Sequence, residues 1–291
     1  MSGETTKSKM IQKKEFVLQG SKGKPVLVDI TFSNENLLIQ KPVIVFCHGF
    51  KGFKDWGTFN LIAEWFAQND FVFVKFNFSH NGTTLSHPTD FMAVEDFGNN
   101  NFLFELNETK SVIDFMIDYQ FAEFKIDKNN ICIIGHSRGG GTAILAGAQH
   151  PAIKKLIAWA PVHEFLKYWD EETLLKIKQD KVLWIENTRT KQRLPMYYQY
   201  WENYENNLNQ LHIPTFVKQL TKPLLVLHGK ADDALDFKHS EEIKSWNRNQ
   251  VSLELFENMN HTFGGKHPWL ENYLPDDTMK ILESSLVFLK F

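Results

Sequence analysis

The sequence has little cysteine, little net charge and no long hydrophobic run, and each of these absences excludes a class of protein. Its two cysteines, Cys47 and Cys132, each lie inside a hydrophobic run, so we expect buried free thiols rather than a disulfide framework. A net charge of −3 provides no basic field that would attract nucleic acid or an anionic membrane surface. We therefore expect neither nucleic acid nor a membrane as a partner.

No stretch approaches the roughly 18 consecutive apolar residues that a membrane-spanning helix needs. The N-terminal segment, Met1 to Lys14, is polar and of mixed charge, and it lacks the apolar centre of a signal peptide. The expected location of the protein is therefore the cytoplasm. Cysteines and histidines do not cluster at ligand spacing either, so no metal site is expected.

What the chain does contain is material for one large core, with 43% hydrophobic and 14% aromatic residues. Short runs rich in β-branched and aromatic residues alternate with longer segments of helical period. This alternation is typical of βαβ units, and it predicts an α/β fold with a mostly parallel sheet and helices on both faces. We expect strands at 15–18, 26–32, 42–47, 71–78, 130–134, 156–160, 224–227 and 251–256, and helices at 59–68, 101–119, 140–148, 241–247 and 278–289.

The alternation stops after Pro161 and resumes only near residue 222. A structureless loop of that length would be unusual inside a compact domain. Helix-forming residues and then aromatic residues fill the interval, so we predict a helical cap over residues 162–221. Residues 1–161 and 222–291 then form the body of the protein.

A Gly-x-Ser-x-Gly motif, Gly135-His136-Ser137-Arg138-Gly139, follows a predicted strand and precedes a helix of small residues. A sharp strand-to-helix turn strains the backbone at the serine, and bulky side chains two residues to either side would collide. Glycine at both flanking positions removes that collision. This context predicts that Ser137 is a nucleophile.

A serine hydroxyl needs a neighbouring base to become nucleophilic. His261 lies in a loop between the last predicted strand and the last helix, where this topology returns the chain to the nucleophile. His267, a few residues further on, is the alternative base.

The base in turn needs a carboxylate to orient it. Asp232 and Asp233 both follow the strand at 224–227, and adjacent side chains point in different directions, so only one of them should face the base. The chain order serine, aspartate, histidine is the order of the α/β-hydrolase fold. For the oxyanion we expect the backbone N–H groups of Arg138, next to the nucleophile, and of Phe50, in the loop His48-Gly49-Phe50.

These motifs, with His228-Gly229 three residues before Asp232, resemble the α/β-hydrolase superfamily over nearly the whole chain. Within it the chain is similar to the serine esterases near dienelactone hydrolases, cinnamoyl (feruloyl) esterases and the catalytic domain of prolyl oligopeptidases. The resemblance implies Asp232 rather than Asp233 as the third catalytic residue, Phe50 as the second oxyanion donor, and no metal or organic cofactor. Dienelactone hydrolases have cysteine where this chain has Ser137, which makes dienelactones poor candidate substrates.

The expected function is hydrolysis of carboxylic esters with small to medium acyl or aromatic-acyl groups, on small-molecule substrates and through an acyl-enzyme. A peptidase or amidase acting on short peptides is the alternative, and a hydrolase-like binding protein without catalysis is a third hypothesis. We expect most of the cap aromatics to fasten the cap to the body. Tyr197, Tyr198 and Trp201 are the candidates for substrate contact. The sequence makes no prediction of oligomeric state.

Overall fold

Eight strands form one mostly parallel sheet in the order β1-β2-β4-β3-β5-β6-β9-β10. The computed structural model describes residues 9–35, 37, 39–167 and 169–290, so the first eight residues of the polar N-terminal segment lie outside the described residues. The first two strands are antiparallel to their neighbours, and all pairs from β4 to β10 are parallel. The strands are β1 (Ile11–Gln19), β2 (Pro25–Ser33), β3 (Gln40–Cys47), β4 (Val72–Asn77), β5 (Lys125–His136), β6 (Ile153–Trp159), β9 (Leu224–Gly229) and β10 (Val251–Phe256).

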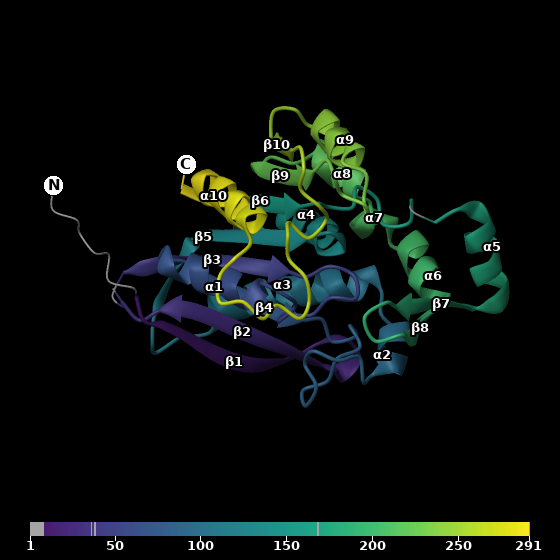
Figure 1. Cartoon of the computed structure of the whole chain (residues 1–291), viewed down its shortest axis with the longest axis horizontal. Helices are drawn as coiled ribbons and strands as arrows, with labels where there is room; N and C mark the ends of the chain where they lie inside the picture. Colours follow the sequence, from purple (N-terminus) through teal and green to yellow (C-terminus); the bar gives the residue numbers. More distant parts are fainter. Residues whose placement is uncertain (1–8, 36, 38, 168, 291) are drawn as a thin grey trace.

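Side chains that alternate along each strand divide the hydrophobic core into two layers. On β3, Val43 and Val45 belong to one layer, whereas Ile44 and Phe46 belong to the other. Helices α1 (Phe59–Gln68) and α10 (Asp276–Lys290) cover the Phe46 side (Figure 1). The Val45 side is covered by α3 (Phe102–Asp118), α4 (Arg138–Gln149), α8 (Ile213–Lys218) and α9 (Lys238–Trp246). The predicted α/β class, with helices on both faces of the sheet, is confirmed.

The segment between β6 and β9 is partly helical and partly a β-hairpin. It contains α5 (Glu171–Asp180), β7 (Val182–Asn187), β8 (Gln192–Tyr197), α6 (Gln199–Asn206) and α7 (Leu208–Leu211) before α8. The antiparallel pair β7–β8 was not expected, although the run Val182-Leu183-Trp184-Ile185 has the composition of a strand. Figure 1 shows α5, α6 and this hairpin beyond the end of the main sheet, beside α2 (Val94–Gly98), a short helix that the sequence pattern did not predict.

Both cysteines are buried in the sheet as free thiols, as the hydrophobic runs around them predict. Burial raises the pKa of Cys47 and of Cys132 to about 12, so both thiols stay protonated and unreactive at neutral pH. None of the helices in the described residues combines the length and the apolar character that crossing a membrane requires.

Candidate active site

The loops that follow four of the parallel strands meet at one edge of the sheet. Ser137 follows β5, Asp232 follows β9, His261 follows β10, and the loop from His48 to Phe50 follows β3. In an open α/β sheet the carboxyl ends of the strands are the usual place for a binding site. The topology therefore brings together residues that lie far apart in the sequence.

Ser137 occupies a strained turn between β5 and α4. Its backbone angles are φ 58° and ψ −123°, in a region that non-glycine residues rarely adopt. A Cβ atom on Gly135 would lie 2.0 Å from the Gly139 carbonyl oxygen, and one on Gly139 would lie 2.4 Å from the carbonyl oxygens of Cys47 and His48. Glycine is therefore required at both positions for the turn to close against β3.

His261 connects Ser137 to Asp232. Its Nε2 atom lies 3.0 Å from the Ser137 hydroxyl oxygen, and its Nδ1 atom lies 2.7 Å from Asp232 Oδ2. Because a carboxylate only accepts, Nδ1 carries the proton, and the unprotonated Nε2 faces the serine hydroxyl. The geometry is that of a nucleophile, a base and an orienting carboxylate.

The carboxylate of Asp232 accepts from three further donors at the end of β9. Its Oδ1 atom accepts hydrogen bonds of 2.8 Å from the backbone N–H groups of Ala234 and Leu235, and Oδ2 also accepts one of 2.9 Å from His228 Nε2. Burial opposes ionisation, but the hydrogen bonds from His228 and His261 outweigh it and hold the pKa of Asp232 well below its usual range. Asp232 is therefore ionised at neutral pH. The neighbouring Asp233 is exposed to solvent.

His228 is fully buried and also contacts the Asp232 carboxylate. Its Nε2 atom contacts two acceptors, Asp232 Oδ2 and the Leu235 carbonyl oxygen, so Nε2 is the protonated ring nitrogen. Nδ1 accepts from the Ser240 hydroxyl at 2.6 Å. A single carboxylate oxygen thus accepts from two histidines, an arrangement that the sequence motif did not suggest.

His136, beside the nucleophile, supports the loop that carries His261. Burial lowers the pKa of His136 to about 3, so its ring is neutral. Its Nε2 atom donates to the His261 carbonyl oxygen at 2.8 Å. The alternative base, His267, lies elsewhere: its Nδ1 accepts from the backbone N–H of Gly57 at 2.9 Å, and its ring packs against Phe53.

The loop after β3 approaches Ser137 closely because Gly49 has no side chain. A Cβ atom at Gly49 would lie 3.1 Å from Ser137 Cβ, which is closer than ordinary van der Waals contact. Arg138 is the first residue of α4, so its N–H has no acceptor inside the helix. Within the described residues no hydrogen-bond acceptor is recorded for the backbone N–H of Phe50 either. Both predicted oxyanion donors are therefore beside the nucleophile and uncommitted.

A buried cluster of four charged side chains fastens the end of this loop to the sheet. Lys54 and Lys75 each lie 2.8 Å from Asp29, and Lys54 lies 2.6 Å from Asp55, which also pairs with Lys75. Burial alone would raise the pKa of Asp55, but the two lysines lower it to about 2. Because two positive charges balance two negative ones, the cluster can be buried without an uncompensated charge.

Arg138 also joins the loop after β3 to the segment between β6 and β9. Its buried guanidinium donates to Glu105 at 2.6 Å and to the Tyr200 hydroxyl at 3.4 Å, and it lies 4.5 Å from the centre of the Phe50 ring. Burial raises the pKa of Glu105, although Arg138 opposes that shift. These contacts fix the side chains of both residues from which the oxyanion donors are expected.

Two cavities flank Ser137. The larger has a volume of about 450 Å³, and its apolar wall comes from Phe50, Val162, Phe165, Trp169, Met196, Tyr200 and Leu235. Its charged lining residues within the described chain are Lys51 and Arg138. The smaller, of about 120 Å³, lies on the side of Gly49, Trp56 and Phe59. His261 borders both cavities.

The three aromatic residues expected to contact a substrate do not line either cavity. Side chains alternate between the two faces of β8, so Met196 faces the larger cavity and Tyr197 points away from it. The Tyr197 hydroxyl donates to Glu95 at 2.7 Å. Tyr198 and Trp201 border a different pocket, between α5 and α6. Met196 and Tyr200, their immediate neighbours, line the larger cavity instead.

The described residues contain no group of three or more histidine, cysteine or acidic side chains that could hold a metal ion.

Fold and sequence relationships together define a serine hydrolase with the α/β-hydrolase fold. The chain belongs to the prolyl oligopeptidase family, whose family model matches residues 58–273. It is 30% identical over 126 residues to a Mycoplasma genitalium protein named "Putative esterase/lipase 2", a match that spans 43% of this chain and only 40% of that protein.

Two solved structures share the fold at low sequence identity. Est1E from Butyrivibrio proteoclasticus, solved with ferulic acid, is 18% identical with a TM-score of 0.68, over 94% of this chain and 98% of that chain. A puromycin-hydrolyzing peptidase of Mycobacterium tuberculosis is 16% identical with a TM-score of 0.64, over 96% of this chain and 39% of that one. The resemblance drawn from the motifs, to α/β-hydrolase esterases, is confirmed.

Proposed function

We propose that the protein hydrolyses carboxylic esters of small to medium acyl or aromatic-acyl groups, with Ser137, His261 and Asp232 as its catalytic triad. The observation that carries the proposal is the position of His261, within 3.0 Å of Ser137 and 2.7 Å of Asp232, beside a largely apolar cavity. Four aromatic rings in the cavity wall, those of Phe50, Phe165, Trp169 and Tyr200, suit an aromatic acyl group.

In the proposed reaction the Ser137 hydroxyl oxygen attacks the ester carbonyl carbon while His261 Nε2 takes its proton. The carbonyl oxygen becomes an oxyanion, which the N–H groups of Phe50 and Arg138 stabilise. The C–O bond to the alcohol then breaks, and His261 returns the proton to the leaving oxygen. Water attacks the acyl-enzyme by the same route and releases the carboxylic acid and free Ser137.

The unequal cavities support a substrate with one bulky half and one small half. We assign the acyl group to the larger cavity and the alcohol to the smaller one, which has room for a short alkyl group. Residues 162–221 supply Val162, Phe165, Trp169, Met196 and Tyr200 to the larger cavity. We therefore propose this segment as a cap that selects the acyl group, on a body formed by 1–161 and 222–291.

A peptidase acting on short peptides is the second candidate, and membership in the prolyl oligopeptidase family favours it. The charges at the site favour esters. Glu105 balances the charge of Arg138, but Lys51 has no ion-pair partner among the described residues and would repel the ammonium group of a free peptide N-terminus.

The test is hydrolysis of p-nitrophenyl esters from acetyl to decanoyl, with one aromatic acyl ester, beside matched p-nitroanilides. Ser137→Ala should lower kcat by ~10⁴–10⁶-fold, and Ser252→Ala, an exposed serine on β10, should leave it unchanged. Turnover of anilides alone would move the assignment to a peptidase. Failure of the wild type to react with both substrates and with a fluorophosphonate would refute the triad.

A further inference from the structure

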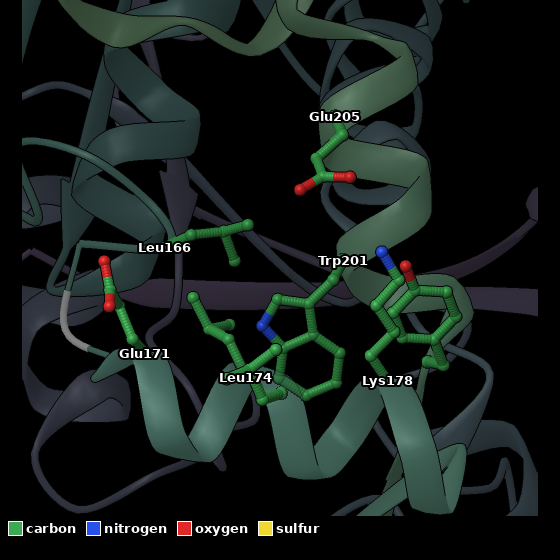
Figure 2. Close-up of a pocket in the computed structure, with 8 residues that line it drawn as sticks. Leu166, Glu171, Leu174, Lys178, Trp201 and Glu205 are labelled. Atoms are coloured by element: carbon green, nitrogen blue, oxygen red, sulfur yellow. The ribbon is translucent and has the colours of Figure 1, made fainter.

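The cap contains a further pocket, separate from the two cavities beside Ser137, that the proposed reaction does not use. It lies between α5 and α6 and has a volume of about 290 Å³. Its apolar lining comes from Leu166, Leu174, Leu175, Tyr198 and Trp201, and Figure 2 shows the Leu174 side chain beside the indole of Trp201. A pocket of this size and composition suits a molecule of one or two rings.

Trp201 gives this pocket an unused hydrogen-bond donor. The residue is 3% exposed, and its indole Nε1 has no hydrogen-bond partner among the described residues. In Figure 2 the nitrogen side of the indole faces the space between Leu166, Leu174 and Glu171. Buried N–H groups are nearly always paired in native proteins, so an acceptor is expected here.

The charged residues around the pocket restrict the charge of its occupant. Glu171 and Glu205 contribute two negative charges and Lys178 one positive charge, so negative charge is in excess. Figure 2 places Glu171 on the side toward which the indole nitrogen points. An anionic molecule would be repelled there, whereas a neutral or cationic one would not.

The pocket is separate from the cavity beside Ser137. Trp201 borders the cap pocket, while Trp169 and Tyr200 border the catalytic cavity, and the Trp201 ring packs edge-on against both. These packed aromatic rings form a wall between the two spaces. A molecule in the cap pocket is thus held apart from the nucleophile.

We propose that the cap pocket binds a small aromatic molecule that carries a carbonyl oxygen and no negative charge, with the carbonyl accepting from Trp201 Nε1. The rings of Tyr198 and Trp201 and the leucine side chains would cover the aromatic body. The molecule is a ligand and not a substrate, so the proposal stands or falls independently of the triad.

The experiment follows the indole N–H signals of the full chain by ¹H–¹⁵N NMR during titration with acetophenone. Trp201→Phe and Trp169→Phe assign the two signals that report the cap pocket and the catalytic cavity. Acetophenone should move the Trp201 signal at a lower concentration than the Trp169 signal. Ethylbenzene, which lacks the carbonyl, should bind about threefold to tenfold more weakly.

Charge is tested with two acetophenones that differ only in the para substituent. The aminomethyl compound should bind at least as tightly as acetophenone, and the carboxylate should bind more weakly. By isothermal titration calorimetry, which does not depend on the Trp201 signal, Trp201→Phe should reduce the affinity for acetophenone to that for ethylbenzene. Trp184→Phe, at a half-exposed residue of β7, should leave the affinity unchanged. The proposal is overturned if acetophenone leaves the wild-type Trp201 signal unmoved, if ethylbenzene binds as tightly, or if the carboxylate binds best.

Discussion

His228 offers the sharpest test of how the site is built, because it touches Asp232 and not the substrate cavities. In His228→Leu, Asp232 Oδ2 loses the 2.9 Å hydrogen bond from Nε2 but keeps the one from His261. Oδ1 keeps its bonds from the backbone N–H groups of Ala234 and Leu235, so the carboxylate stays in the site. The expected effect is therefore smaller than the loss of a triad residue.

The magnitude follows from the type of hydrogen bond that is lost. A hydrogen bond to a charged group contributes about 1.5–3 kcal/mol, which corresponds to about tenfold to a hundredfold in rate if the whole of it orients the base. The lost donor also leaves more negative charge on Oδ2, which favours the protonated form of the His261 ring. We thus expect kcat/KM to fall by about tenfold to a hundredfold. In the pH profile of kcat/KM, the acidic limb should move to higher pH.

The assay is the pH profile of kcat/KM for the best p-nitrophenyl ester, with thermal unfolding measured in parallel. His228→Gln retains an N–H donor and should recover part of the rate and the position of the acidic limb. Ser240→Ala removes only the partner of Nδ1, so its profile should stay close to the wild type. A profile unchanged in His228→Leu, with only a lower Tm, would refute a role for His228 in positioning Asp232.

Three further predictions test the loop, the cap and the turn. Asp55→Asn should cost about 2–3 kcal/mol of unfolding free energy at pH 7, because the pKa of Asp55 is about 2 in the fold. The ionised Asp55 carboxylate stabilises the fold fully above about pH 4, the pKa of an aspartate in the unfolded chain. The difference in unfolding free energy between wild type and Asp55→Asn, measured in urea, should therefore shrink as pH falls from about 4 to 2. A difference that stays constant over this range would contradict the prediction. Met196→Ala should move the preferred acyl chain to greater length, whereas Tyr197→Ala should not, and equal effects in the ester series would refute the orientation of β8. Gly135→Ala should destabilise the fold by about 3 kcal/mol or more, since its Cβ would lie 2.0 Å from a backbone oxygen, and a urea midpoint near wild type would contradict the turn geometry.

The sequence alone determined the parts of the protein that depend on local pattern. The strand, the glycine-flanked serine and the small-residue helix are contiguous, so Ser137 and its turn could be predicted from neighbouring residues. The alternation of strands and helices predicted a parallel sheet, whose strands end at one edge. That edge explains why Ser137, Asp232 and His261 could be expected to lie together, although the choice of Asp232 over Asp233 rested on family resemblance.

Only the tertiary structure decided which side chains line the cavities and which buried polar groups share partners. Met196 and Tyr197 are adjacent, and which of them faces Ser137 depends on how the β7–β8 hairpin docks on the body. The contact between His228 and Asp232 depends on how the loop after β9 folds back, and the pairing of Asp29 with Lys54 and Lys75 joins three separate segments. Such contacts are set by packing between distant parts of the chain, and local sequence pattern carries no information about that packing.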